Sequence, residues 1–151
     1  MNKQPIIRLT KEFRFEAAHA LWNHDGLCKH IHGHSYILFV TVKGTPLNIP
    51  DDPKNGMVMD FSVLKNIVKP NIVDIFDHSL VINANSPHVE LAQNKKFSRV
   101  IAVDYQPTCE NMILDFKNKI EPFLPEGVKL HSLRLYETAT SYAEWMANEN
   151  H

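Results

Sequence analysis

The sequence has little cysteine, no long apolar run and no excess of charge of either sign. Its 151 residues include only Cys28 and Cys109, so no disulfide framework is indicated, and a reducing cytoplasm is the simplest expectation. No stretch approaches the roughly 18 apolar residues that span a membrane, and the polar first residues lack the apolar run of a signal peptide. The formal net charge is -1, with lysine and arginine scattered along the chain. We therefore expect neither a nucleic acid nor a membrane as the main partner.

Histidine, by contrast, is abundant. The chain has 9 histidines, and 5 of them lie between positions 19 and 34. Imidazole is the commonest metal ligand among side chains, and its ordinary pKa lies near neutrality. The chemistry of this chain is therefore expected first in that segment.

Hydrophobic periodicity predicts a single domain over residues 1–151 with an α+β fold. Strands are expected at 6–20, 34–43, 99–105 and 128–136, with loops at 44–56 and around 83–98. One helix should follow an N-cap at Asp60 and end or kink at Pro70, and a second should begin at Pro107 or Thr108. Residues 21–31 are too few and too irregular for a crossover helix, so the first two strands should pair antiparallel. Two helices would then cover one face of an antiparallel sheet.

Three histidines have the spacing of a metal site. His32 and His34 begin the second expected strand, where residues i and i+2 share a face, so both imidazoles can reach one ion about 2.0–2.1 Å away. His19 lies near the end of the neighbouring strand. Three neutral nitrogens suit zinc and leave a fourth position open for water or substrate, which favours a catalytic site. The alternative is that these histidines are surface residues or satisfied core residues.

Several other side chains are candidates for acid–base chemistry. Cys28 beside a metal would favour its thiolate, although it can also be a small buried residue or a fourth zinc ligand. Asp77 and His78 can form an acid–base pair, but only in a turn or across two subunits, because adjacent strand residues point to opposite sides. Glu137 and Glu110 can each accept two parallel N–H groups from a planar ring. Glu110 can instead serve as a first-turn acid at a helix N-terminus.

Together these residues resemble the 6-pyruvoyl-tetrahydropterin synthase and 6-carboxytetrahydropterin synthase family. The matching stretches follow the family's order through nearly the whole chain. They are Phe15-Glu16-Ala17-Ala18-His19, then Cys28 followed by His32-Gly33-His34 and Tyr36, Gly56-Met57-Val58-Met59-Asp60-Phe61, Asp77-His78, Pro107-Thr108 with Glu110-Asn111, and Glu137-Thr138.

The resemblance implies an architecture and a substrate. The family fold, the T-fold, packs two antiparallel helices on one face of a four-stranded antiparallel sheet. Its subunits form trimeric barrels that pair as hexamers, which are dimers of trimers, with active sites at the subunit interfaces. Such a homo-oligomer would also cover the exposed edges of a small sheet. The implied substrate is a small pterin, 7,8-dihydroneopterin triphosphate.

The resemblance also implies roles for the site residues. The zinc ligands would be His19, His32 and His34. The residues that move protons would be Cys28, Asp77 and His78. The substrate-binding residues would be Glu137, which anchors the pterin ring through its amino-pyrimidinone edge, with Glu110 and Thr108.

The spacing between Cys28 and His32 bears on the reaction. The gap of three residues is shorter than is typical of the pyruvoyl branch and resembles the bacterial carboxytetrahydropterin synthase of the queuosine (7-deazaguanine) pathway. That enzyme forms 6-carboxy-5,6,7,8-tetrahydropterin with loss of acetaldehyde and triphosphate. The alternatives are a pyruvoyl-forming lyase, a zinc-binding module without catalysis in which Cys28 closes the metal site, and a zinc hydrolase.

Two positions depart from the family pattern. The segment between His78 and Asn83 is one residue longer than usual, and Trp145 stands where a tyrosine is common. Both concern the wall of the expected pocket.

Overall fold

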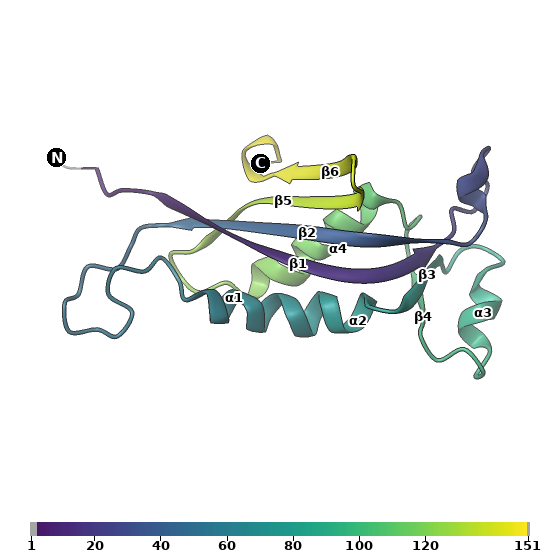
Figure 1. The fold of residues 1–151 in the computed structure, drawn as a ribbon, viewed down its shortest axis with the longest axis horizontal. Helices are drawn as coiled ribbons and strands as arrows, with labels where there is room; N and C mark the ends of the chain where they lie inside the picture. The colour runs from purple at the N-terminus through teal and green to yellow at the C-terminus, as the bar shows by residue number, and fades with distance from the viewer. Residues whose placement is uncertain (1–2, 151) are drawn as a thin grey trace.

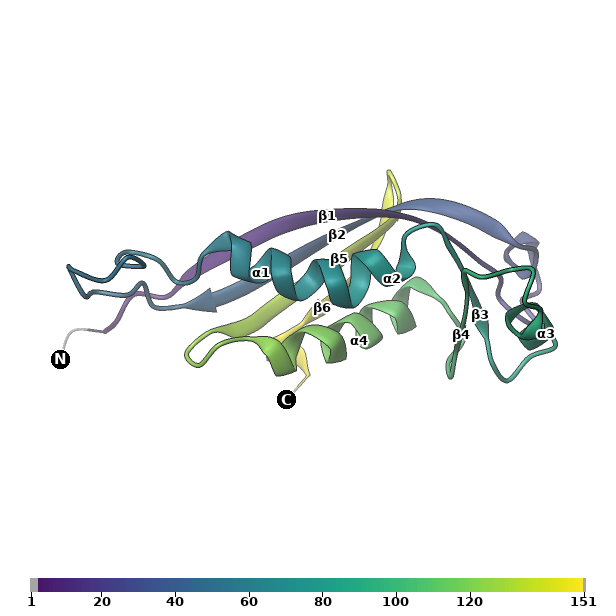
Figure 2. The same cartoon turned by 90° about the horizontal axis from the view of Figure 1, so that it is seen from below.

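The computed structural model describes residues 3–150, which form a curled sheet with helices along one face (Figures 1 and 2). The strands are β1 (Ile7–His19), β2 (His32–Gly44), β3 (Ser79–Asn83), β4 (Val100–Val103), β5 (Lys129–Thr138) and β6 (Ser141–Met146). The α-helices are α1 (Phe61–Val68), α2 (Asp74–Phe76), α3 (Val89–Gln93) and α4 (Cys109–Ile120). No helix within these residues is both long enough and apolar enough to cross a membrane.

The sheet has six strands in the order β4-β3-β1-β2-β5-β6. β1 and β2 form a long antiparallel hairpin, as predicted, and β5 and β6 continue the antiparallel part. β3 and β4 add to the other edge in parallel. The expected four-stranded, wholly antiparallel sheet is therefore wrong. The sequence did not reveal β3 because this strand is five residues long and mostly apolar without alternation, as is usual for parallel strands.

The two long helical segments begin where the capping residues predict. The carboxylate of Asp60 accepts a hydrogen bond from the Ser62 amide at 2.8 Å, and the Thr108 hydroxyl accepts one from the Asn111 amide at 3.1 Å. The α-helix α1 ends at Val68, just before Pro70, as expected, but the chain remains helical beyond the proline. A π-helical turn over Lys69–Val73 carries the chain past the proline, which has no N–H to donate, and continues into α2.

The helices cover the face of the sheet that carries alternate apolar residues of β1 and β2. Phe15 stacks on Tyr36 with ring centroids 5.0 Å apart, and Phe116 of α4 meets Phe15 edge-on. Both strands continue this alternation toward the end of the hairpin that holds His19, His32 and His34. The imidazoles therefore extend the core face of the sheet rather than its solvent face.

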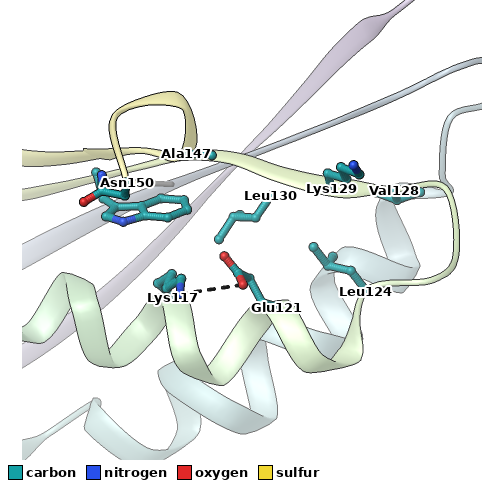
Figure 3. A pocket seen from close by; sticks show the side chains of 9 residues that line it. Lys117, Glu121, Leu124, Val128, Lys129, Leu130, Ala147 and Asn150 are labelled. Carbon is teal, nitrogen blue, oxygen red and sulfur yellow. Dashed lines mark ion pairs between the residues drawn. The ribbon is translucent and has the colours of Figure 1, made fainter.

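A crevice lies between α4 and the last residues of the chain (Figure 3). Two of its charged groups are paired with each other, since Lys117 Nζ lies 3.7 Å from the Glu121 carboxylate (Figure 3). The same Nζ lies 5.7 Å from the ring centroid of Trp145. Leu130, which also lines it, pairs with the β2 end opposite to the histidines. This crevice and the histidines therefore lie at opposite ends of the β1–β2 hairpin.

Candidate metal centre and active site

The three predicted histidines meet at one point of the structure, together with a carboxylate. His19 and His32 are directly paired across β1 and β2, and His34 lies two residues further along β2. Glu137, near the end of β5, brings its carboxylate to the same place. One ligand atom from each of these four residues lies within 4.8 Å of every other.

Two backbone carbonyls fix the orientation of the paired histidines. The Nδ1 atom of His19 lies 2.6 Å from the Pro107 carbonyl, and the Nδ1 atom of His32 lies 2.7 Å from the His30 carbonyl. Because a carbonyl only accepts, each Nδ1 carries the proton, and each neutral ring keeps a lone pair on Nε2. The two Nε2 atoms face each other at 3.0 Å. A metal ion bound by both lone pairs would satisfy this arrangement, and such carbonyl partners are usual for histidines that bind metals.

His34 and Glu137 complete the donor set. The Nε2 atom of His34 lies 2.8 Å from Oε1 of Glu137, yet within the described residues this buried nitrogen has no well-oriented hydrogen bond. Burial lowers the pKa of His34 and so favours its neutral, metal-binding form. The nearby imidazole of His19, followed by those of His34 and His32, holds the pKa of Glu137 below its usual range. Neutral imidazoles with one carboxylate form a set of donors that can hold a divalent metal ion.

Cys28 lies outside this cluster. It is in a short 3-10 turn between β1 and β2, is partly exposed, and its carbonyl accepts a hydrogen bond from the Leu21 amide at 2.9 Å. Glu137, rather than the Cys28 thiol, is the fourth donor that the structure places beside the histidines. Cys109 is buried against Leu135, and burial raises the pKa of its thiol to about 12, so it is not a competing nucleophile.

Asp77 and His78 lie in a turn, as their cooperation within one chain requires. His78 has a φ of 60°, in the left-handed region, and its Nδ1 atom lies 2.9 Å from the Asp77 carboxylate. The other oxygen of that carboxylate accepts a hydrogen bond from the Glu16 amide at 2.8 Å. The His78 amide donates a hydrogen bond to the Glu16 carbonyl at 2.6 Å. The Glu16 amide, more than the imidazole, lowers the pKa of Asp77. The pair is thus an ionised carboxylate orienting an imidazole.

Arg99 holds this turn from the other side. One terminal nitrogen of its guanidinium donates to the carbonyls of Asp74, at 3.1 Å, Ile75, at 3.0 Å, and Asp77. These carbonyls end α2, where they lack partners in the helix and where a positive charge is favourable. Arg99 was not predicted from the sequence, because nothing local relates it to a turn 22 residues earlier at Asp77.

The acid–base pair and the histidine cluster face opposite sides of the sheet. His78 lines a shallow crevice with Glu16, Gly33 and Ser35. Glu16 and Ser35 are paired and hydrogen-bonded at 2.6 Å, and their positions alternate with those of the histidines along β1 and β2. His34 borders this crevice too, so the two faces meet close to the metal site. Among the described residues, His19 and His32 do not line this crevice, so most of the metal cluster is directed elsewhere than the His78 imidazole.

The remaining candidates lie at the start of α4. Thr108 is the N-cap of α4, and the Thr108 hydroxyl accepts a hydrogen bond from the Asn111 amide. Glu110 is exposed in the first turn, which is the alternative role that the sequence allowed. The Pro107 carbonyl, just before this cap, binds His19 and was not identified from the sequence.

Comparisons with known proteins agree with these features. Residues 8–148 match the family model described as 6-pyruvoyl tetrahydropterin synthase. The 6-carboxy-5,6,7,8-tetrahydropterin synthase of Haemophilus influenzae is 34% identical over 143 residues, which cover 93% of this chain and 99% of that protein. The protein of the same name from Aquifex aeolicus is 32% identical over 161 residues, in an alignment that covers 91% of this chain and 96% of that protein.

Solved structures share the fold. An uncharacterized protein from Wolinella succinogenes superposes with a TM-score of 0.79 at 21% identity, covering 95% of this chain and 99% of that one. The 6-pyruvoyl tetrahydropterin synthase of Caenorhabditis elegans gives a TM-score of 0.68 at 24% identity, covering 97% and 99%. The sequence match over almost the whole length, with this shared fold, shows that the chain belongs to the 6-pyruvoyl tetrahydropterin synthase family of enzymes.

Proposed function

We propose that the chain is a zinc-dependent lyase that converts 7,8-dihydroneopterin triphosphate to 6-carboxy-5,6,7,8-tetrahydropterin, with loss of acetaldehyde and triphosphate, in the cytoplasmic route to queuosine. The observation that carries this proposal is the cluster of His19, His32 and His34, whose Nε2 atoms are directed at a common point. The proposal is supported by relatives of 30% identity or more that are named 6-carboxy-5,6,7,8-tetrahydropterin synthase.

The cluster and the turn have separate tasks in this reaction. Zinc held by His19, His32 and His34 would lower the pKa of the hydroxyl groups on the substrate side chain. Cys28, as a thiolate, takes a proton from carbon. His78 returns a proton to the substrate from its Nε2, because Asp77 holds the other ring proton on Nδ1. Water then carries the proton of the Cys28 thiol back to the imidazole, so that both groups regain their starting state. Glu137 anchors the ring, since a carboxylate can accept two parallel hydrogen bonds from the amino-pyrimidinone edge.

A second copy of the chain completes the site in this proposal. The proton-moving turn and the metal cluster lie on opposite faces of one sheet, so a neighbouring subunit would supply one of them. The sheet has two free edges within the described chain, β4 and β6, which can pair with other copies. A hexamer built from two trimeric barrels would use both edges.

Product analysis tests the reaction. The purified protein loaded with zinc is incubated with 7,8-dihydroneopterin triphosphate, and acetaldehyde and triphosphate are measured. Equal amounts of both are expected. Release of triphosphate without acetaldehyde would instead assign the chain to the pyruvoyl-forming branch. Release of neither product would indicate a zinc-binding module that does not catalyse this reaction.

A further inference from the structure

The carboxylate of Glu137 lies against the histidines, where a ring-anchoring carboxylate would not be needed. We propose that Glu137 is the fourth protein ligand of the metal site before substrate binds, and that it leaves the metal when the pterin ring binds to it. Recognition of the ring then opens the coordination position that the substrate hydroxyls use. This inference rests on the proposed function, because the pterin ring of the proposed substrate is the second partner of Glu137.

The distances in the cluster fit four ligands of one ion. Neighbouring donors of a tetrahedral zinc ion with bonds of 2.0–2.1 Å lie about 3.4 Å apart. Oε1 of Glu137 lies 2.8 Å from Nε2 of His34 and 3.5 Å from Nε2 of His19, and the latter lies 3.0 Å from Nε2 of His32. Glu137 therefore occupies the place of a donor in the set.

Charge favours the same assignment. Three neutral imidazoles leave both positive charges of a divalent ion without compensation, whereas a carboxylate neutralises one of them. Within the described residues, Glu137 has no lysine or arginine partner, and the basic side chains close to its carboxylate are the imidazoles of His19 and His34. The carboxylate thus has no other partner that would hold it away from a metal.

The backbone at Glu137 is suited to a side chain that serves two partners. In the pairing of β5 with β6, Tyr136 is opposite Tyr142 and Thr138 is opposite Ser141, so Glu137 is the extra residue of a β-bulge. Bulges redirect a side chain and are common beside active sites. The Glu137 side chain is 26% exposed, so it is not enclosed by the core.

The two tasks exclude each other at any one moment. Both oxygens of Glu137 are needed for two parallel hydrogen bonds to a planar N–H edge, whereas one of them now lies among the metal donors. A ring that captures the carboxylate therefore frees a coordination position. A molecule without the ring cannot do so, which would make metal activation depend on correct ring recognition.

Cobalt absorption separates ring recognition from chemistry. The full-length protein is loaded with Co²⁺, and unsubstituted pterin, which has the ring but no side-chain hydroxyls, is added while binding is followed by pterin fluorescence. We expect the visible Co²⁺ spectrum to change in parallel with ring binding. In Glu137→Gln, chelator competition should show metal affinity lower by at least about tenfold. Glu12→Gln, which removes an exposed carboxylate from β1, should bind metal as the unchanged protein does.

The outcomes distinguish this inference from the proposed function. If pterin binds without changing the Co²⁺ spectrum, or if Glu137→Gln retains the original metal affinity, the exchange is wrong and the proposed reaction still stands. If pterin does not bind the unchanged protein at all, the proposed function itself fails. Glu137→Asp provides a second variant should Glu137→Gln not fold, and its shorter carboxylate should weaken metal binding while the metal-free protein keeps its circular dichroism spectrum.

Discussion

The histidine cluster and the Asp77–His78 turn are both built around β1, yet their surroundings are opposite. His19 is 1% exposed, whereas the His78 side chain is 75% exposed. The cluster is complete within one chain, down to the carbonyls that orient two of its rings. The turn has its orienting carboxylate but presents its imidazole to open space. A metal site benefits from fixed donors shielded from water, whereas a proton-moving group must remain accessible to a ligand.

The two regions also differ in what holds them. Side chains meet one another in the cluster, so its geometry depends directly on residue identity at four positions. The turn is held mainly through backbone groups, by the amide and carbonyl of Glu16 and by the guanidinium of Arg99. Substitutions should therefore affect metal binding in one region and proton transfer in the other.

The largest effect is expected in the cluster. His34→Ala removes one of four donors, and if about 10–16 kcal/mol of zinc binding is shared among them, the loss is roughly 3 kcal/mol, or about a hundredfold in affinity. Metal content after dialysis against a chelator measures this loss, and turnover should disappear with it. Because the Nε2 atom of His34 lacks a hydrogen-bond partner within the described residues, the metal-free variant should unfold at nearly the original temperature. Full metal content in His34→Ala would contradict the assignment.

A large effect without metal loss is expected in the turn. His78→Gln removes the proposed general acid–base group, so kcat should fall by about 10²–10⁴-fold. The metal content should stay at the original value, because His78 is not among the donors of the cluster. Steady-state kinetics together with metal analysis test this separation. Loss of zinc in His78→Gln would show that the two regions are not independent.

A smaller effect is expected from Arg99, whose guanidinium binds carbonyls of α2 and of the turn. Arg99→Ala should loosen the carbonyls of α2 and misplace His78, lowering kcat by about tenfold to a hundredfold with little change in KM. Lys69→Ala is the matched control, because Lys69 pairs with Asp74 near the same helix end without reaching the turn. Equal losses of kcat in both variants would point to general destabilisation instead.

The smallest effect concerns pH and Asp77. Its pKa in the folded chain is lowered, so its ionised form contributes stability above the unfolded pKa of about 3.9, and this contribution is lost as pH falls through the lower, folded value. Because the side chain is 38% exposed and screened by water, the gain should stay below about 1 kcal/mol. Urea unfolding of the original chain and Asp77→Asn should differ by a constant amount from pH 7 to 5 and converge in more acidic solution. A difference that grows toward low pH would have the wrong sign.

Local patterns predicted the parts of the molecule that depend on neighbours in sequence. The hairpin of β1 and β2 followed from its short connection, and the meeting of the three histidines followed from the i, i+2 rule once that hairpin was assumed. The caps at Asp60 and Thr108 were recognisable for the same reason.

Contacts between distant segments were not predictable in this way. The Pro107 carbonyl is 88 residues from His19, and Arg99 reaches a turn 22 residues earlier at Asp77. Glu137 was identified as a site residue but not as a neighbour of the metal donors, because the bulge that carries it depends on pairing with the unpredicted strand β6. Such positions are set by tertiary packing, which overrides local pattern.

Mixed oligomers test most directly the claim that one chain supplies the metal cluster and its neighbour supplies the turn. His34→Ala and His78→Gln, each inactive alone, are refolded together in equal amounts and assayed for acetaldehyde release. If each site joins the two regions from different chains, random mixing should restore about a quarter of the original activity. Activity in the mixture no higher than that of the separate variants would contradict this account.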